Sequence, residues 1–282
     1  MLARPVHEPD VSNAWLQALA ALNHNPQRSA LHTVVTIDDP TAEDPQVRAE
    51  ADRLLAQFDM APINTVANTI FPAGLAALSD SHEDLVHRYN EIYPLLRSRW
   101  HQNSQGTYFG RLISFGASGT EPGYDQLGAI IRKLAAEHAR GNGKTALYEA
   151  AFGGTSHTGD TGGFDEAEDL AEADRLPPPV AAAATIYSPG HDKLPVGGFP
   201  CLSHCSFQLD REGRVHALAQ YRSQYLVERG YGNYLGLGRL LDYVCQQTGL
   251  ARGCLTVTAG YAQIEVNITK VRALLAHPKS LF

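Results

Sequence analysis

One short segment, and the two that follow it, carry side-chain types that work together in enzymes. Cys201 and His204 lie three residues apart, and Gln208 ends the same predicted strand. Arg222 follows in the next predicted strand, and Asn233 comes eleven residues later. A thiol can act as a nucleophile, an imidazole moves protons, a guanidinium binds an anion bidentately, and an amide reads a ring edge. This set of groups indicates an enzyme that acts on a pyrimidine nucleotide.

The elements that must position these residues are predicted from periodicity and turn signals. Strands follow helices without strict alternation, which favours an α+β fold with a sheet packed by helices over a doubly wound fold. The predicted strands span 30–37, 182–187, 201–209, 215–221 and 255–258, and the predicted helices span 12–22, 49–58, 84–100, 124–139 and 236–248. Segment 64–75 is apolar but broken by Pro72 and Gly74, and Pro94 is expected to kink or split the helix that contains it.

Composition limits the class of protein. The 282 residues carry a net charge of −7, with 44% hydrophobic and 19% charged residues, which is ordinary for a soluble globular chain. The absence of a basic stripe argues against a nucleic-acid polymer as partner, and no apolar run approaches the ~20 residues of a membrane span. The four cysteines lack paired zinc spacing, so we expect free thiols in a cytoplasmic protein that has no membrane partner.

The chain is predicted to form one domain over residues 1–282, with an insertion at about 153–180. This stretch is rich in Gly, Ser, Thr and acidic residues, and it ends in three prolines. Such a composition is typical of a flexible surface loop rather than of a core element.

The run from Pro200 to Glu265 resembles the thymidylate synthase superfamily. The motifs that carry the resemblance are Pro200-Cys201…His204, Tyr221-Arg222-Ser223, Asn233, the apolar helix near 237–247 and Thr258-Ala259-Gly260-Tyr261. Weaker matches lie upstream, at Tyr124-Asp125-Gln126-Leu127 and Tyr108-Phe109-Gly110. The resemblance covers about a quarter of the chain without these upstream motifs, and about half with the weaker helical matches.

The resemblance implies a fold, a reaction and a set of roles. The fold would be a large twisted mixed sheet packed by helices, and the chain would form a homodimer by stacking sheets across a two-fold axis. The reaction would transfer a methyl or hydroxymethyl unit from 5,10-methylenetetrahydrofolate to C5 of a pyrimidine nucleotide, through an adduct between a cysteine and C6. Cys201 would be the nucleophile, with His204 and Tyr108 in the proton and water network. The substrate-binding residues would be Arg222, Ser223, Asn233, Gln208, Gln263 and Glu265, and an Asn at 233 is the family's choice for uracil.

The chain also departs from the family pattern. Counting back from Gln208 without a gap places Ser203, not Cys201, at the nucleophile's position, so the match requires two extra residues. Such an insertion preserves the side-chain face of a strand, which predicts that Cys201, Ser203 and Cys205 point the same way, with a local irregularity in the strand.

Other family residues are replaced. Alanines occupy 181–184, where the family lends two arginines to the phosphate of the neighbouring subunit, and Arg28, Arg97 and Arg99 are the substitutes to consider. Asn68 stands near the position of the catalytic Glu, and Tyr225 replaces an Asp. Gln263 and Glu265 replace the His and Tyr that read the ribose. A nucleotide-binding or regulatory protein of the same fold, without turnover, therefore remains the alternative.

Overall fold

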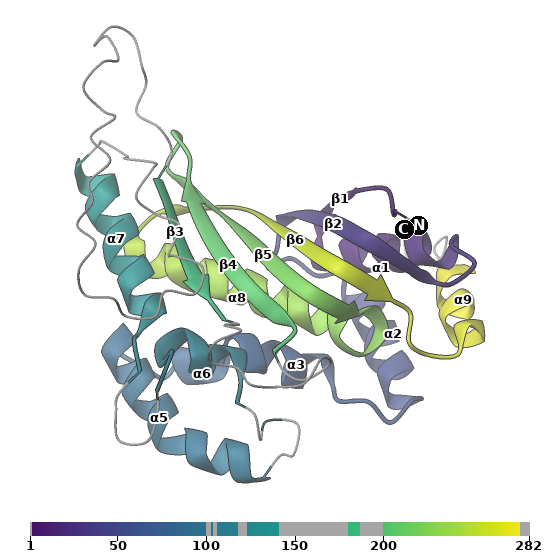
Figure 1. The fold of residues 1–282 in the computed structure, drawn as a ribbon, viewed down its shortest axis with the longest axis horizontal. Helices are drawn as coiled ribbons and strands as arrows, with labels where there is room; N and C mark the ends of the chain where they lie inside the picture. Colours follow the sequence, from purple (N-terminus) through teal and green to yellow (C-terminus); the bar gives the residue numbers. More distant parts are fainter. Residues whose placement is uncertain are drawn as a thin grey trace, which may run out of the picture.

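The computed structural model describes residues 2–99, 103, 106–117, 123–140, 180–186 and 200–276. These residues form a mixed six-stranded sheet packed by helices, which confirms the predicted α+β class (Figure 1). All but the last residue of the insertion expected at 153–180 lie outside the described residues, and Val180 begins strand β3.

The sheet has the strand order β1-β2-β6-β5-β4-β3. The pairs β1–β2 and β5–β6 are parallel, and the other three pairs are antiparallel. The strands are β1 (Val6–Asp10), β2 (Ser29–Asp39), β3 (Val180–Thr185), β4 (Leu202–Leu209), β5 (Arg214–Tyr225) and β6 (Ala251–Gln263). A single hydrophobic core joins the sheet to the helices.

The helices are α1 (Val11–Asn23), α2 (Pro45–Ala56), α3 (Ile63–Ile70), α4 (Ala73–Ala76), α5 (His82–Arg99), α6 (Tyr108–Ile113), α7 (Gln126–Arg140), α8 (Tyr231–Thr248) and α9 (Ile268–Ala276). Helices α1 to α7 precede β3 in sequence, α8 lies between β5 and β6, and α9 follows β6. A π-helical turn, η2 (Leu226–Gly230), joins β5 to α8. Figure 1 shows α8 behind strands β4 to β6, so that the opposite face of these strands is turned to the viewer.

Several predicted boundaries were wrong. Strands β5 and β6 extend well beyond 215–221 and 255–258, because pairing with long neighbours continues past the apolar runs. Helix α8 begins at Tyr231, five residues earlier than predicted, since its glycines occupy helical positions rather than a turn. Helix α5 runs through Pro94 without a break, and α3 ends before Pro72 as a separate helix from α4.

Helix α8 depends on glycines that let it approach its neighbours closely. A Cβ at Gly232 would lie 2.5 Å from Val66 Cβ, and one at Gly236 would lie 2.7 Å from the carbonyl oxygen of Ala67. Both contacts are with α3. A Cβ at Gly238 would lie 1.8 Å from the carbonyl oxygen of Pro40, which is far closer than two non-bonded atoms can approach. The missing side chains therefore set the distance between α8, α3 and the turn after β2.

We expect Gly238→Ala to lower the free energy of unfolding by at least about 2 kcal/mol, because the methyl group would overlap backbone that cannot move alone. Gly74→Ala is the matched control, since no atom lies within 4 Å of the added methyl and Gly74 lies in the short helix α4. That substitution should be neutral or raise stability by up to about 1 kcal/mol. Urea denaturation of both variants measures the difference, and equal effects would refute the close-packing argument.

Candidate functional site

A cavity of about 360 Å³ opens beside the end of β5. Its described walls come from six parts of the fold. Helix α3 contributes Val66 and Thr69, and the segment from residue 103 to α6 contributes Asn103, Gly106, Thr107 and Tyr108. Cys201 precedes β4, and the remaining lining residues come from β5 (Tyr221, Ser223, Tyr225), η2 (Glu228, Arg229) and α8 (Asn233).

The cavity brings together four of the residues that the sequence singles out. Tyr108, Cys201, Ser223 and Asn233 are separated by up to 125 positions (233 − 108 = 125), yet all four line the same space. Asn233 is buried in the first turn of α8. A thiol, two hydroxyl groups and an amide thus lie around a volume within the range of small-ligand sites.

The strand that follows Cys201 contains a register shift against β5. Leu202 pairs with Tyr221 but His204 pairs with Gln220, so Ser203 is an extra residue in β4. Its hydroxyl donates to the carbonyl oxygen of Gln220 (2.9 Å), and Ser203 is not among the described residues that line the cavity. The irregularity was predicted, but because of it the simple side-chain alternation expected from Cys201 to Cys205 does not hold. Of the two candidate nucleophiles, Cys201 is the one placed in the cavity.

The electrostatic environment of Cys201 has two opposing parts. Burial raises the pKa of its thiol, while the nearby charges of Arg222 and Arg229 lower it, and the net shift is upward. The thiol is therefore protonated at neutral pH in this structure. Attack by Sγ requires a base or a further positive charge to favour the thiolate.

Tyr108 lies next to the thiol and is itself protonated at neutral pH. Burial raises the pKa of Tyr108 to about 12, and hydrogen bonds with the backbone of Leu202 and Cys201 oppose this shift. The phenol therefore ties α6 to the segment that carries the thiol. It can donate or accept a hydrogen bond, but it is not a phenolate.

Tyr221 lines the cavity, although sequence reasoning quoted it only as part of the Tyr221-Arg222-Ser223 motif and gave it no role in the site. Its hydroxyl is buried and has no hydrogen-bond partner among the described residues, and burial raises its pKa well above the usual value. A buried hydroxyl without a partner calls for an explanation, and a ligand in the adjoining cavity would provide one. The alternation of β5 could have indicated Tyr221, since it faces the opposite side of the sheet from Arg222.

For two predicted polar residues, Arg222 on β5 and His204 on β4, the described partners are backbone groups of neighbouring segments. The guanidinium of Arg222 donates through Nε (3.0 Å) and Nη2 to the carbonyl oxygen of Pro200, which holds the segment before Cys201. His204 is paired with Gln220 in the β4–β5 ladder. Neither Arg222 nor His204 is among the described lining residues.

The three remaining predicted substrate-binding residues also lie outside the described cavity wall. Gln208 donates to Ser206 Oγ (2.8 Å) near the far end of β4, and Gln263 accepts from the Tyr261 hydroxyl (3.0 Å). Glu265 accepts backbone N–H groups of η2. In this structure Glu265 acts as a cap for that turn.

Comparison of the chain with models of known protein families and with curated proteins finds no match. Within the residues that the structure describes, no group of His, Cys, Asp and Glu side chains is arranged to hold a metal ion. None of the helices in the described ranges is long and apolar enough to cross a membrane.

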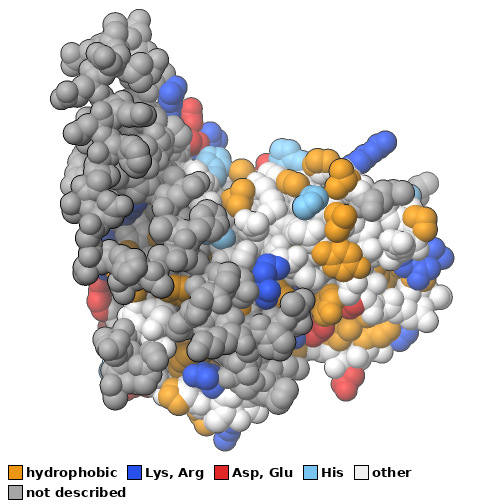
Figure 2. All heavy atoms as spheres, viewed as in Figure 1, with side chains coloured by type: hydrophobic (Ala, Val, Ile, Leu, Met, Phe, Trp, Pro, Cys, Tyr) orange, Lys and Arg blue, Asp and Glu red, His pale blue; other side chains and the backbone are white. Residues whose placement is uncertain are grey.

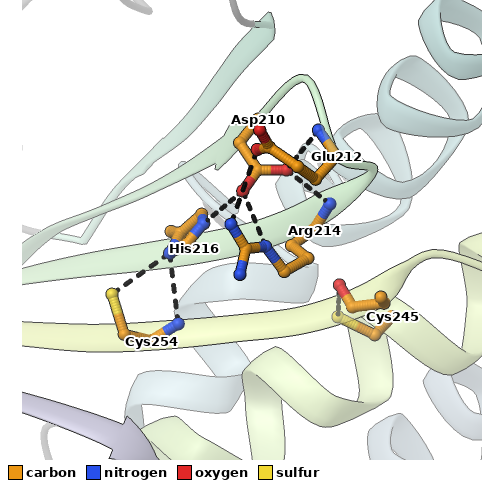
Figure 3. Close-up of polar contacts among 7 residues, drawn as sticks. Asp210, Glu212, Arg214, His216, Cys245 and Cys254 are labelled. Atoms are coloured by element: carbon orange, nitrogen blue, oxygen red, sulfur yellow. Dashed lines mark hydrogen bonds and ion pairs between the residues drawn. The ribbon is translucent and has the colours of Figure 1, made fainter.

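A second thiol lies next to a histidine outside the cavity. His216 Nε2 contacts Asp210 Oδ2 (2.9 Å), and His216 Nδ1 contacts Cys254 Sγ (3.1 Å), as Figure 3 shows. The backbone N–H of Cys254 also donates to Nδ1 (3.1 Å), which makes Nδ1 an acceptor and leaves the ring proton on Nε2. Because that acceptor position is already used, His216 is poorly placed to take the thiol's proton. The cluster instead ties the β4–β5 turn to β6.

Asp210 makes this cluster sensitive to acid. Partial burial alone raises the pKa of Asp210, but hydrogen bonds from His216 and Arg214 outweigh it and hold that pKa well below its usual value. The carboxylate therefore stabilises the fold above the ordinary Asp pKa of about 3.9, and this contribution is lost as the pH falls below it.

We expect Asp210→Asn to be less stable than the wild type at pH 7 and to lose less stability between pH 5 and pH 2. Urea denaturation across this range measures both slopes, and parallel curves would contradict the assignment.

Proposed function

We propose that this protein transfers a one-carbon unit to C5 of a pyrimidine nucleotide through a covalent adduct between Cys201 Sγ and C6, within a thymidylate-synthase-like fold. The observation that carries the proposal is the meeting of Tyr108, Cys201, Ser223 and Asn233 at one cavity. These residues come from the motifs that resemble the superfamily. A volume of about 360 Å³ is sufficient for a nucleotide-sized ligand.

The first step is addition of the thiolate to the ring. Sγ forms a bond to C6, the C5–C6 π bond breaks, and its electron pair moves toward the ring carbonyl to give an enolate. A placed hydrogen-bond donor stabilises this developing charge, and the buried amide of Asn233 is suited to that role. Because the same amide has an acceptor oxygen, it can also read the N–H of a uracil-type ring.

The enolate makes C5 nucleophilic, so C5 would form a bond to the methylene carbon of the donor while one of that carbon's two C–N bonds breaks and the released nitrogen takes up a proton. Loss of the C5 proton to a base and expulsion of Sγ as a thiolate would then re-form the C5–C6 π bond. Release of the remaining nitrogen would require a hydride from the reduced folate for a methyl product, or water for a hydroxymethyl product.

The protonated hydroxyl of Tyr108 lies beside the thiol and is the proposed start of the proton and water network. His204 lies outside the described cavity wall, so its proposed part in this network is through intervening water. Ser223 of strand β5, the neighbour of β4, supplies a second hydroxyl group in the described cavity wall.

The proposed donor is 5,10-methylenetetrahydrofolate, which would supply the one-carbon unit. A cavity of about 360 Å³ is near the lower end of the range for ligand pockets, so its described walls fit a nucleotide without also accounting for a pteridine. No step is therefore assigned to a residue that holds the folate.

A binding or regulatory protein of the same fold is the second candidate. It is favoured by the raised pKa of Cys201, because burial outweighs the two nearby arginines and keeps the thiol protonated. In that case the cavity would bind a nucleotide without forming the adduct.

Release of tritium from C5-labelled UMP, dUMP, CMP or dCMP tests the covalent step directly. We expect the wild type to release tritium from one of these nucleotides and Cys201→Ala to reduce that rate at least about a thousandfold, as loss of a nucleophile does. Cys254→Ala is the matched control, since its thiol lies outside the cavity, and it should retain wild-type activity. Calorimetric binding of a nucleotide without tritium release would favour the second candidate, and an unchanged rate in Cys201→Ala would exclude Cys201 as nucleophile.

We also propose that the chain forms a homodimer through the sheet face that α8 does not cover. On β5, the residues at 216, 218, 220 and 222 face this side and are more exposed than Val215, Ala217, Ala219 and Tyr221. Figure 2 views the molecule from this side and shows hydrophobic and histidine side chains on the surface that is not grey. The resemblance leads us to expect that two chains pack their sheets face to face. The exposed face of β5 is the surface that we propose for this contact.

The homodimer is tested by sedimentation velocity. We expect the wild type to sediment as two chains of 30.6 kDa, and Leu218→Glu to shift it toward the monomer, because a charge would be buried between the sheets. Leu78→Glu serves as the control, since Leu78 is 71% exposed and follows helix α4 rather than lying in a strand of the sheet. A monomeric wild type would refute this interface.

A further inference from the structure

The π-helical turn η2 presents two charged side chains to the cavity. It follows β5 directly and leads into α8, so it connects the sheet to the helix that lies behind it (Figure 1). π-helical turns are rare and occur frequently at functional sites. Glu228 and Arg229 of this turn both line the cavity.

Contacts from distant parts of the chain hold this turn in place. The Glu265 carboxylate accepts the backbone N–H groups of Val227 and Glu228. Trp15 Nε1 donates to the carbonyl oxygen of Leu226 (2.7 Å), and a Cβ at Gly230 would lie only 3.3 Å from Trp15 Cδ1. The turn is therefore fixed at its start and at its end, and its charged side chains have a defined direction.

Glu228 and Arg229 are the charged residues among the described residues of the cavity wall. Arg229 Nη2 lies 2.7 Å from Glu228 Oε1, and both side chains are partly exposed. A guanidinium has five N–H donors in a planar arrangement, so pairing with one carboxylate oxygen leaves capacity for a second anion. The other arginine near the thiol, Arg222, directs Nε and Nη2 to the Pro200 carbonyl oxygen instead.

We propose that Arg229, rather than Arg222, binds the anionic group of the ligand in this cavity, and that Glu228 holds the guanidinium in position until the anion arrives. The substrate class is therefore an anion with a ring that reaches Asn233 and Cys201. Identification of that anion as a nucleotide phosphate rests on the proposed function, whereas the position of the cation does not. Arg222 keeps a different task, which is to fix the backbone before Cys201.

Selective alkylation of Cys201 tests the position of this cation without any knowledge of the substrate. Iodoacetate is an anion and iodoacetamide is neutral, so the ratio of their rates at one thiol reports the local positive charge and cancels the thiol's own reactivity. Peptide mass spectrometry reads Cys201 and Cys254 in the same sample, and Cys254 is the internal control outside the cavity. We expect the rate ratio at Cys201 to exceed that at Cys254 by about tenfold at low salt.

Three variants test whether Arg229 presents its charge to the cavity. Arg229→Gln should lower the ratio at Cys201, and Arg229→Lys should retain most of it because the charge remains. Arg222→Gln should lower the ratio as well, since the charge of Arg222 also acts on this thiol. An unchanged ratio in Arg229→Gln would overturn the proposal. Thermal melting of each variant confirms that the comparison is made on folded protein.

Calorimetry with dUMP and deoxyuridine then tests the identity of the anion. We expect Arg229→Gln to weaken dUMP binding about tenfold or more and to leave deoxyuridine binding unchanged, because only the nucleotide carries the phosphate. Equal losses for both ligands would contradict an anion-binding role. If the wild type binds neither ligand, the pyrimidine assignment fails, and the alkylation ratio still decides the role of Arg229.

Discussion

The close approach of helix α8 to its neighbours is the constraint on which the rest of the structure depends. Gly232 and Gly236 allow its backbone to lie against α3, and Gly238 allows it to lie against the turn after β2. Since α8 also packs against β6, this one helix sets the distance between the sheet and the helical layer. The cavity lies where α3, the start of α8 and the end of β5 meet, so its walls are fixed by the same contacts.

Around that constraint, the site divides into parts with different structural support. Asn233 lies in a helix whose side chains are mostly buried, and Ser223 lies in a central strand. Cys201 precedes β4, where Tyr108 and Arg222 hold the backbone. Arg229 lies in a turn that depends on Glu265 and Trp15. The amide of Asn233 is thus held by regular secondary structure, while the Cys201 thiol and the Arg229 guanidinium depend on tertiary contacts.

The sequence predicted those features that local periodicity determines. The strands predicted at 30–37, 201–209 and 215–221 correspond to β2, β4 and part of β5. The start of α8 was missed, because glycines that serve helix packing look like turn residues when considered alone. Turn η2 could not be predicted, since Glu265 and Trp15 stabilise it from opposite ends of the chain. Consequently Glu228 and Arg229 were overlooked, although they are charged residues next to the buried Leu226 and Val227. Their direction into a cavity is a tertiary property.

The extra residue in β4 has a consequence for how such a site can change over time. Ser203 is accommodated by one register shift, and the ladder from His204 to Leu209 continues against β5 without further irregularity. The backbone of Arg222 donates to the carbonyl oxygen of Cys201 (2.8 Å), so the thiol stays attached to β5 despite the added length. An extra residue at the start of a strand can therefore change the sequence distance between Cys201 and the strand while Ser223 and Asn233 keep their places in β5 and α8. In a fold built this way, reactivity and recognition can diverge independently, because they are attached to the sheet at different points.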